Sequence, residues 1–287
     1  MTALGVVGRG VWSENICKTL DAIPGVEWMR LNADRRSAPA GLDGVIIANR
    51  SQDHVETAIP FLEDGISCFI EKPVALSLVD LGRLRQSCLA SDAEIFSGHI
   101  HCFNPAVQCF VNEMSTLGDV ISLNGVFCNS KPRADVSVLW DWLPHPVSIA
   151  QLIFAHGPNR VKASAHQGLL QIDDVRAELF FGDIPFTIQA NWLSPQARME
   201  ITCVCERGVI FFDDKAPSKV RIEQNNQSRF PVYAADLPLL LELQAFVSLL
   251  RGHKPNVCGL DQAGCVTSVI EALHQSIAMG AVEVILN

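Results

Sequence analysis

Apolar runs of strand length alternate with longer amphipathic segments over the first 98 residues of the chain. The runs predict strands over residues 3–8, 26–32, 44–49, 67–71 and 94–98. The segments between them predict helices over residues 11–23, 53–64 and 77–91. Alternation of this kind favours a parallel sheet with right-handed crossovers. Only a loop fits between Asp34 and Gly44, so we expect an abridged, doubly wound Rossmann-type sheet.

After a helix expected over residues 103–117, extended runs separated by turn signals replace this alternation. They predict strands over residues 120–128, 160–166, 169–181, 186–192, 197–206 and 209–213. Helices near 238–251 and 261–279 and a last strand at 282–286 complete the pattern. We therefore expect an α/β protein with a dinucleotide-binding domain over residues 1–118. An α+β domain for substrate binding and oligomerisation, with a large and mostly antiparallel sheet, should follow over residues 119–287.

Composition limits the kinds of partner. The length of 287 residues favours two domains. The net charge is −9, and the 22 lysines and arginines are scattered along the chain, which argues against nucleic acid as a partner. No apolar stretch reaches the roughly 18 residues that a membrane span needs, and the first residues lead directly into a strand. We expect a soluble, cytoplasmic protein that does not bind a membrane.

The ten cysteines fall within apolar runs, and none has the Cys-x-x-Cys spacing of a zinc or redox site. Cys203 and Cys205 alternate along one predicted strand. Cysteines of this kind in a cytosolic protein are most often buried or half-buried free thiols. We therefore expect neither a disulfide framework nor a metal site.

A glycine-rich loop, Gly8-Arg9-Gly10, lies between the first strand and the first helix. Glycines at these positions let the backbone turn tightly and approach a pyrophosphate, which the free amides at the helix start would bind. Ser13 stands where the fingerprint has its third glycine. The loop and the two residues after it, Val11 and Trp12, therefore form a candidate dinucleotide site.

The cofactor's adenosine ribose should lie after the second strand. There Asp34 would bind the ribose hydroxyls, whereas Arg35 and Arg36 would accept a 2′-phosphate. Both kinds of residue are present, so the choice between NAD and NADP stays open.

The fourth expected strand ends in Glu71-Lys72-Pro73. Ligands of open α/β sheets bind at the carboxyl ends of the strands, and Pro73 favours an extended Lys72. Lys72 is therefore a candidate catalytic residue.

Asp141 precedes His145 by four residues, and Pro144 or Pro146 suits the start of a helix that runs toward Phe154. The imidazole would take the proton of a substrate hydroxyl, and Asp141 would orient the imidazole or bind a neighbouring hydroxyl. The local sequence around the other histidines indicates structural or solvated side chains.

These motifs resemble those of the Gfo/Idh/MocA family of NAD(P)-dependent oxidoreductases over nearly the whole chain. The matching segments are the glycine loop at residues 8–13, the segment from residue 46 to His54, and the Glu-Lys-Pro of residues 71–73. Residues 98–99 and 103–105 also match, as does the Asp-x-x-x-His pattern of Asp141 and His145. The resemblance implies Lys72, Asp141 and His145 as the catalytic set. It implies a cofactor site that comprises Gly8, Gly10, Val11, Trp12, Asp34, Arg35, Asn49, His54, Glu71 and Lys72. It implies a substrate site that comprises Lys72, His99, Asn104, Trp140, Asp141 and His145.

The expected activity is hydride transfer between NAD or NADP and a hydroxyl or keto group of a sugar, polyol or nucleotide-linked sugar. Trp192-Leu193-Ser194-Pro195, with Arg198 and Asp213-Asp214 after it, is similar to the family branch that acts on nucleotide-linked sugars. The family also implies a homodimer or homotetramer formed through the second-domain sheet. Two alternatives stay open: a non-catalytic regulatory protein that binds a dinucleotide or sugar, and a lyase or glycosidase that uses the cofactor transiently.

Overall fold

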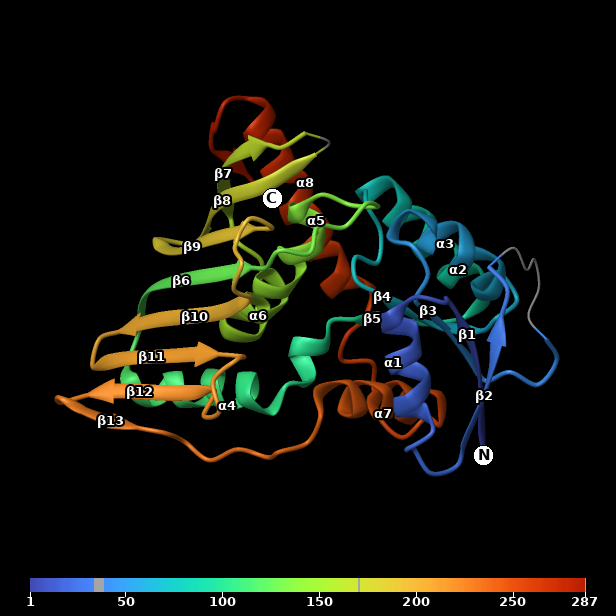
Figure 1. The fold of residues 1–287 in the computed structure, drawn as a ribbon. Helices are drawn as coiled ribbons and strands as arrows, with labels where there is room; N and C mark the ends of the chain where they lie inside the picture. Colours follow the sequence, from blue (N-terminus) through green and yellow to red (C-terminus); the bar gives the residue numbers. More distant parts are fainter. Residues whose placement is uncertain (34–38, 170, 287) are drawn as a thin grey trace. The chain divides into compact units, whose positions relative to one another are not determined.

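The computed structural model describes residues 1–33, 39–169 and 171–286. The chain forms two compact units (Figure 1). The first comprises Met1–Phe103 and Asp236–Thr267, and the second comprises Asn104–Ala235 and Ser268–Asn287. A single boundary at residue 118 does not describe this division, because the chain enters the second unit at Asn104 and returns to the first at Asp236.

The sheet of the first unit is parallel throughout and has the strand order β2-β1-β3-β4-β5. Its strands are β1 (Thr2–Val7), β2 (Val26–Leu31), β3 (Gly44–Ile47), β4 (Ser67–Glu71) and β5 (Ile95–Gly98). The Rossmann order is 3-2-1-4-5-6, and deleting its third strand leaves the order seen here. Within the described residues β2 is an edge strand, so the expected abridged sheet is confirmed.

Helices cover both faces of this sheet (Figure 1). On one face, α2 (His54–Glu63) and α3 (Leu78–Ser91) pack on apolar residues of β3 and β4, which include Val45, Ile47 and Ile70. On the other face lie α1 (Val11–Leu20) and α7 (Pro238–Leu250), a helix from late in the chain. The ring of Phe246 on α7 lies 5.8 Å from that of Phe69 and 5.7 Å from that of Phe96. The doubly wound arrangement is therefore completed by α7.

The second unit is built on a nine-stranded sheet with the order β13-β12-β11-β10-β6-β9-β8-β7-β14. Its strands are β6 (Val120–Cys128), β7 (Arg160–Gln167), β8 (Ile172–Phe181), β9 (Ile184–Asn191), β10 (Arg198–Cys205), β11 (Gly208–Asp213), β12 (Val220–Gln224), β13 (Gln227–Arg229) and β14 (Val284–Ile285). Only the β6–β9 pair is parallel within the described residues, which confirms the expected mostly antiparallel sheet. The short, charged β12 and β13 were not predicted, because neither contains an apolar run.

Helices pack on one face of the nine-stranded sheet. They are α4 (Pro105–Met114), α5 (Val138–Trp142) and α6 (Pro144–Phe154), and the last turns of α8 (Leu260–Ala278) also belong to this unit. Buried and half-exposed residues alternate along β8, β9 and β10, so the opposite face of the sheet stays half-exposed.

Short 3-10 turns occur in both units, at Ser51–Asp53, Ile100–Phe103 and Ser115–Leu117.

All ten cysteines are free thiols, seven of them buried and three half-buried, as the sequence predicted. Among the described helices, none combines the length and the apolar character that crossing a bilayer requires.

Candidate active site

The glycine loop after β1 fits a phosphate group. Gly8 has φ = 135°, and a Cβ there would lie 2.3 Å from the carbonyl oxygen of Ala48, so a side chain is excluded at this position. Gly10 precedes α1 without a side-chain cap, and a Cβ there would meet nothing within 4 Å. The first amides of α1 therefore have no capping side chain, and the space beside Gly10 is open. A pyrophosphate needs this combination of free amides and close backbone approach.

Ser13, at the third position of the fingerprint, is buried and hydrogen-bonded. Its hydroxyl donates to the Gly8 carbonyl oxygen over 3.0 Å. Arg30, near the end of β2, donates through Nη1 to the same carbonyl and, over 2.8 Å, to the Ser13 hydroxyl. Its Nη2 lies 2.7 Å from a carboxylate oxygen of Glu14. The Ser13 hydroxyl is therefore fully hydrogen-bonded at a position where the fingerprint has glycine. Arg30 links the glycine loop to α1, and the sequence analysis did not predict this role.

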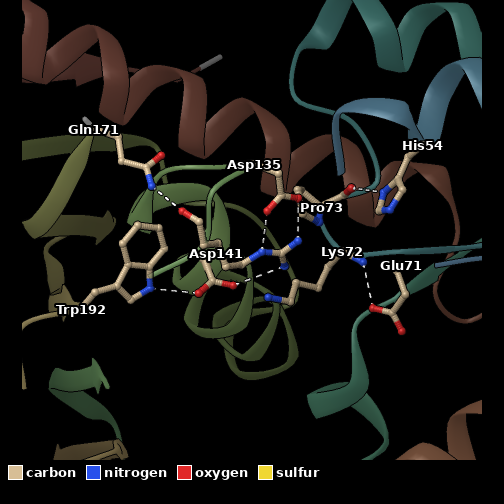
Figure 2. Close-up of polar contacts among 9 residues, drawn as sticks. His54, Glu71, Lys72, Pro73, Asp135, Asp141, Gln171 and Trp192 are labelled. Atoms are coloured by element: carbon tan, nitrogen blue, oxygen red, sulfur yellow. Dashed lines mark hydrogen bonds and ion pairs between the residues drawn. The ribbon is translucent and has the colours of Figure 1, made fainter. Parts of the chain in front are cut away.

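Glu71 is buried at the carboxyl end of β4, and both its carboxylate oxygens accept hydrogen bonds. One accepts from the indole Nε1 of Trp12, in the first turn of α1. The other accepts from the backbone amide of Lys72 over 3.2 Å (Figure 2). These bonds place the glycine loop and Lys72 at one edge of the sheet. His54, assigned to the cofactor site by resemblance, is buried, and its Nδ1 donates over 2.8 Å to the Pro73 carbonyl (Figure 2). It therefore fixes the segment that follows Lys72.

Asn49 and His99 lie after β3 and β5. The Asn49 amide donates to the Thr57 hydroxyl over 2.9 Å. His99 is only 1% exposed, and neither of its ring nitrogens has a hydrogen-bond partner within the described residues. Burial, together with the nearby charges of Lys72 and His101, lowers the pKa of His99 to about 4. The imidazole is therefore neutral at physiological pH.

A second buried carboxyl group, that of Glu242 on α7, was not predicted from the sequence. It is 0% exposed, and neither carboxyl oxygen has a partner among the described residues. Burial is the largest cause that raises its pKa well above the ordinary value, followed by the charge of Glu71 and the nearby Cys102. Glu242 is therefore a neutral acid near the Glu71 carboxylate. Only the return of α7 to the first unit brings the two together.

In the second unit Asp141 is held from two sides (Figure 2). The indole Nε1 of Trp192, just after β9, donates to Oδ2 over 3.1 Å, and Nη1 of Arg133 lies 3.6 Å from Oδ1. Arg133 also forms a bidentate pair with Asp135, with distances of 3.0 and 2.7 Å. The Gln171 amide donates to the Arg133 backbone carbonyl over 2.5 Å. This network fixes the Asp141 carboxylate, and Arg133 and Asp135 were missed by sequence reasoning.

His145 is the second residue of α6, which begins at Pro144 as expected. The imidazole is mostly buried and packs edge to face against Trp142, with ring centroids 5.8 Å apart. The Ser148 hydroxyl donates over 2.9 Å to the His145 carbonyl. His145 and Asp141 therefore come from the two consecutive helices α6 and α5.

The other predicted substrate and cofactor residues have contacts of different kinds. Asn104 caps α4 by accepting the Ala106 amide over 3.0 Å, and Trp140 stacks on His274 with ring centroids 6.1 Å apart. Both contacts are structural. Val11 is exposed at the first position of α1. The predicted ribose-binding residues Asp34, Arg35 and Arg36 lie outside the described residues.

Known proteins share this sequence pattern and this fold. Residues 11–99 match the model of the Gfo/Idh/MocA oxidoreductase family, which has an NAD-binding Rossmann fold. Oxidoreductase P35 of Formosa agariphila is 22% identical over 253 residues, covering 80% of this chain and 78% of that protein.

Two solved structures share the fold of the whole chain. UDP-N-acetylglucosamine 3-dehydrogenase GnnA from Acidithiobacillus ferrooxidans has a TM-score of 0.85 at 19% identity, covering 96% of this chain and 98% of that one. An inositol dehydrogenase homologue from Azotobacter vinelandii, solved with NADH and myo-inositol, has a TM-score of 0.81 at 14% identity, covering 99% and 97%.

The family match covers the glycine-loop helix, Glu71 and Lys72, and the fold of the neighbours extends over both units. Residues 11–99 therefore resemble the NAD-binding part of the Gfo/Idh/MocA oxidoreductases, and the chain is an NAD(P)-dependent dehydrogenase or reductase.

Proposed function

We propose that the protein transfers a hydride between NAD(H) or NADP(H) and a CH–OH or keto carbon of a sugar or polyol. One observation carries this proposal. Lys72, at the carboxyl end of β4, and the glycine loop lie at the same sheet edge, joined by the bonds of Glu71 to Trp12 and to the Lys72 amide. A cofactor bound along this edge would have its reactive end beside a lysine.

The nicotinamide, when bound by the glycine loop and Glu71, supplies the hydride acceptor or donor. His145 accepts the proton of the substrate hydroxyl during oxidation and returns it to the carbonyl oxygen during reduction. The Lys72 ammonium binds the reacting oxygen and stabilises its developing negative charge. Asp141, held by Trp192 and Arg133, accepts hydrogen bonds from a neighbouring hydroxyl and so orients the substrate.

A polyhydroxylated substrate agrees with this set of side chains. The Asp141 carboxylate can accept hydrogen bonds from hydroxyl groups, and the neighbours named above act on a sugar nucleotide or bind myo-inositol. Within this class we favour a nucleotide-linked sugar. Trp192 opens the Trp-Leu-Ser-Pro segment that suggested this branch, and its indole bonds to Asp141.

The test is single-turnover kinetics of cofactor reduction with a panel of sugars, polyols and sugar nucleotides. Lys72→Ala and His145→Ala should leave folding nearly intact and lower the rate by about 100- to 10,000-fold, the usual contribution of acid-base catalysis. Lys254→Ala and His253→Ala remove the same side chains from an exposed loop and should change nothing.

Oxidation should also be faster at higher pH, because only a neutral imidazole accepts a proton, and His145→Ala should abolish this rise. A loss of less than about tenfold, or a pH profile shared by variant and wild type, would assign the proton transfer to another group. Nucleotide binding without turnover on any substrate would favour the regulatory alternative.

We also propose that the protein forms a homodimer or homotetramer through the half-exposed face of the nine-stranded sheet. Alternating half-exposed residues along β8, β9 and β10 support this proposal, since a second copy would cover them. Sedimentation analysis measures the state directly, and a monomer at micromolar concentration would contradict it.

A further inference from the structure

The side chain of Trp12 connects two functional segments of the first unit. Trp12 is the second residue of α1, so its backbone amide is among those offered to a phosphate. Its indole N–H donates to Glu71, which is 6% exposed and also accepts the Lys72 amide. Trp12 itself remains 40% exposed. The indole is thus fixed through its N–H, while a large part of the ring stays open.

The contact crosses the carboxyl end of β3. Strands β1 and β4 flank β3 in the sheet, and neighbouring strands lie roughly 4.8 Å apart. The link from the loop after β1 to the end of β4 therefore spans roughly 10 Å. A dinucleotide with its pyrophosphate at the start of α1 and its reactive ring beside Lys72 must cover the same interval.

We propose that Trp12 is the surface on which the nicotinamide ring packs, oriented by the bond of its indole to Glu71. The inference rests on the proposed function, in which Lys72 stands at the reacting carbon. Flat rings pack favourably in offset stacks on an indole. The oxidised nicotinamide also carries a positive charge, which the electron-rich indole face and the Glu71 carboxylate both attract. Trp12 therefore favours the oxidised ring over the reduced one.

If Trp12 only supported the glycine loop and did not contact the nicotinamide ring, its substitution would have a different effect on ligand binding. The loss of the indole would then weaken the binding of every ligand that uses the loop. ADP-ribose contains the pyrophosphate and both riboses but lacks nicotinamide. Comparing ADP-ribose with NAD⁺ and NADH therefore separates contact with the ring from support of the loop.

The experiment is calorimetric titration of the full-length protein with NAD⁺, NADH and ADP-ribose. Trp12→Leu should weaken NAD⁺ binding by about tenfold and NADH binding by less, while ADP-ribose affinity stays within about twofold. Trp12→Phe, which keeps a smaller aromatic ring, should fall between wild type and Trp12→Leu. Trp28→Phe is the control for Trp12→Phe, since it removes an indole that donates to Asp21 over 2.8 Å and keeps an aromatic ring beside Arg30.

A spectroscopic readout is independent of affinity. An indole stacked on an oxidised nicotinamide gives a charge-transfer absorption at wavelengths beyond those of either ring alone, so saturating NAD⁺ should produce it in wild type and in Trp28→Phe but not in Trp12→Leu. Equal losses for NAD⁺ and ADP-ribose, or no loss for NAD⁺, would overturn the inference. A wild type that binds neither these three ligands nor NADP⁺ would instead contradict the proposed function, because no nicotinamide cofactor would then bind.

Discussion

Gly8 and Gly10 stand two residues apart in one loop, yet a side chain would meet different surroundings at the two positions. At Gly8 a Cβ collides with the Ala48 backbone, and φ lies in the region that side chains rarely adopt. At Gly10 a Cβ meets no atom of the protein within 4 Å. The first glycine is therefore required by the fold, and the second leaves space for a ligand.

The two positions predict different outcomes for the same substitution. Gly8→Ala should lower the free energy of unfolding by about 1–3 kcal/mol, because the native φ is strained and the backbone contact must relax. Gly10→Ala should cost less than about 1 kcal/mol, yet weaken NAD(H) binding, because its methyl group occupies the space beside the free amides. Denaturant unfolding and calorimetry measure both quantities. Equal stability losses would contradict this distinction.

Among the elements, α7 connects the late part of the chain to the first sheet. It buries Phe246 against Phe69 and Phe96, and it places the neutral acid Glu242 near Glu71. A Cβ at Gly44 of β3 would lie 2.7 Å from a Leu250 side-chain carbon, so this strand and α7 are in close contact. The first unit therefore depends on residues that lie between the two segments of the second unit in sequence.

This dependence can be measured with one substitution. Phe246→Ala should lower the stability of the protein by about 3–5 kcal/mol, since it removes a fully buried aromatic ring from a packed cluster. Leu237→Ala, at an exposed position just before the helix, should change stability by no more than about 0.5 kcal/mol. If chemical denaturation gave similar values for the two variants, α7 would not be part of the core.

For the molecule as a whole, two buried groups of opposite kinds make stability depend on pH in opposite directions. His99 has a lowered pKa, so between about 6.5 and about 4 the unfolded chain binds a proton that the folded protein does not, and stability falls as the pH falls. Glu242 has a raised pKa, so above about 4.5 the unfolded chain releases a proton that the folded protein keeps, and stability falls as the pH rises.

Single variants should separate these opposing slopes. In wild type, protonation of the unfolded histidine should lower the free energy of unfolding by roughly 3 kcal/mol as the pH falls from 6.5 to 4, and His99→Gln should abolish this loss. Glu242→Gln should abolish the fall in the free energy of unfolding as the pH rises toward neutral. Unfolding free energies measured across this range give both slopes relative to wild type. Parallel profiles for wild type and His99→Gln would mean that this imidazole is not buried in the neutral form.

The two sheets and the chemical motifs were predictable from local pattern. Alternating apolar runs identified the strands of both sheets apart from β12 and β13, and short segments such as Gly8-Arg9-Gly10 and Glu71-Lys72-Pro73 were recognisable because their residues are adjacent in the chain. Periodicity reports which face of an element is apolar. It therefore predicts that a helix packs on a sheet, without specifying the partner.

Pairings between distant residues were decided by folding alone. Trp12 and Glu71 are 59 residues apart and meet because β1 and β4 flank the same strand. Arg133 and Trp192 reach Asp141 from a loop and from the end of β9, and α7 returns to a sheet formed early in the chain. Such contacts depend on the order of the strands in each sheet and on the return of the chain from one unit to the other. The periodicity of apolar residues does not specify either feature, because many arrangements of the same elements bury the same apolar faces.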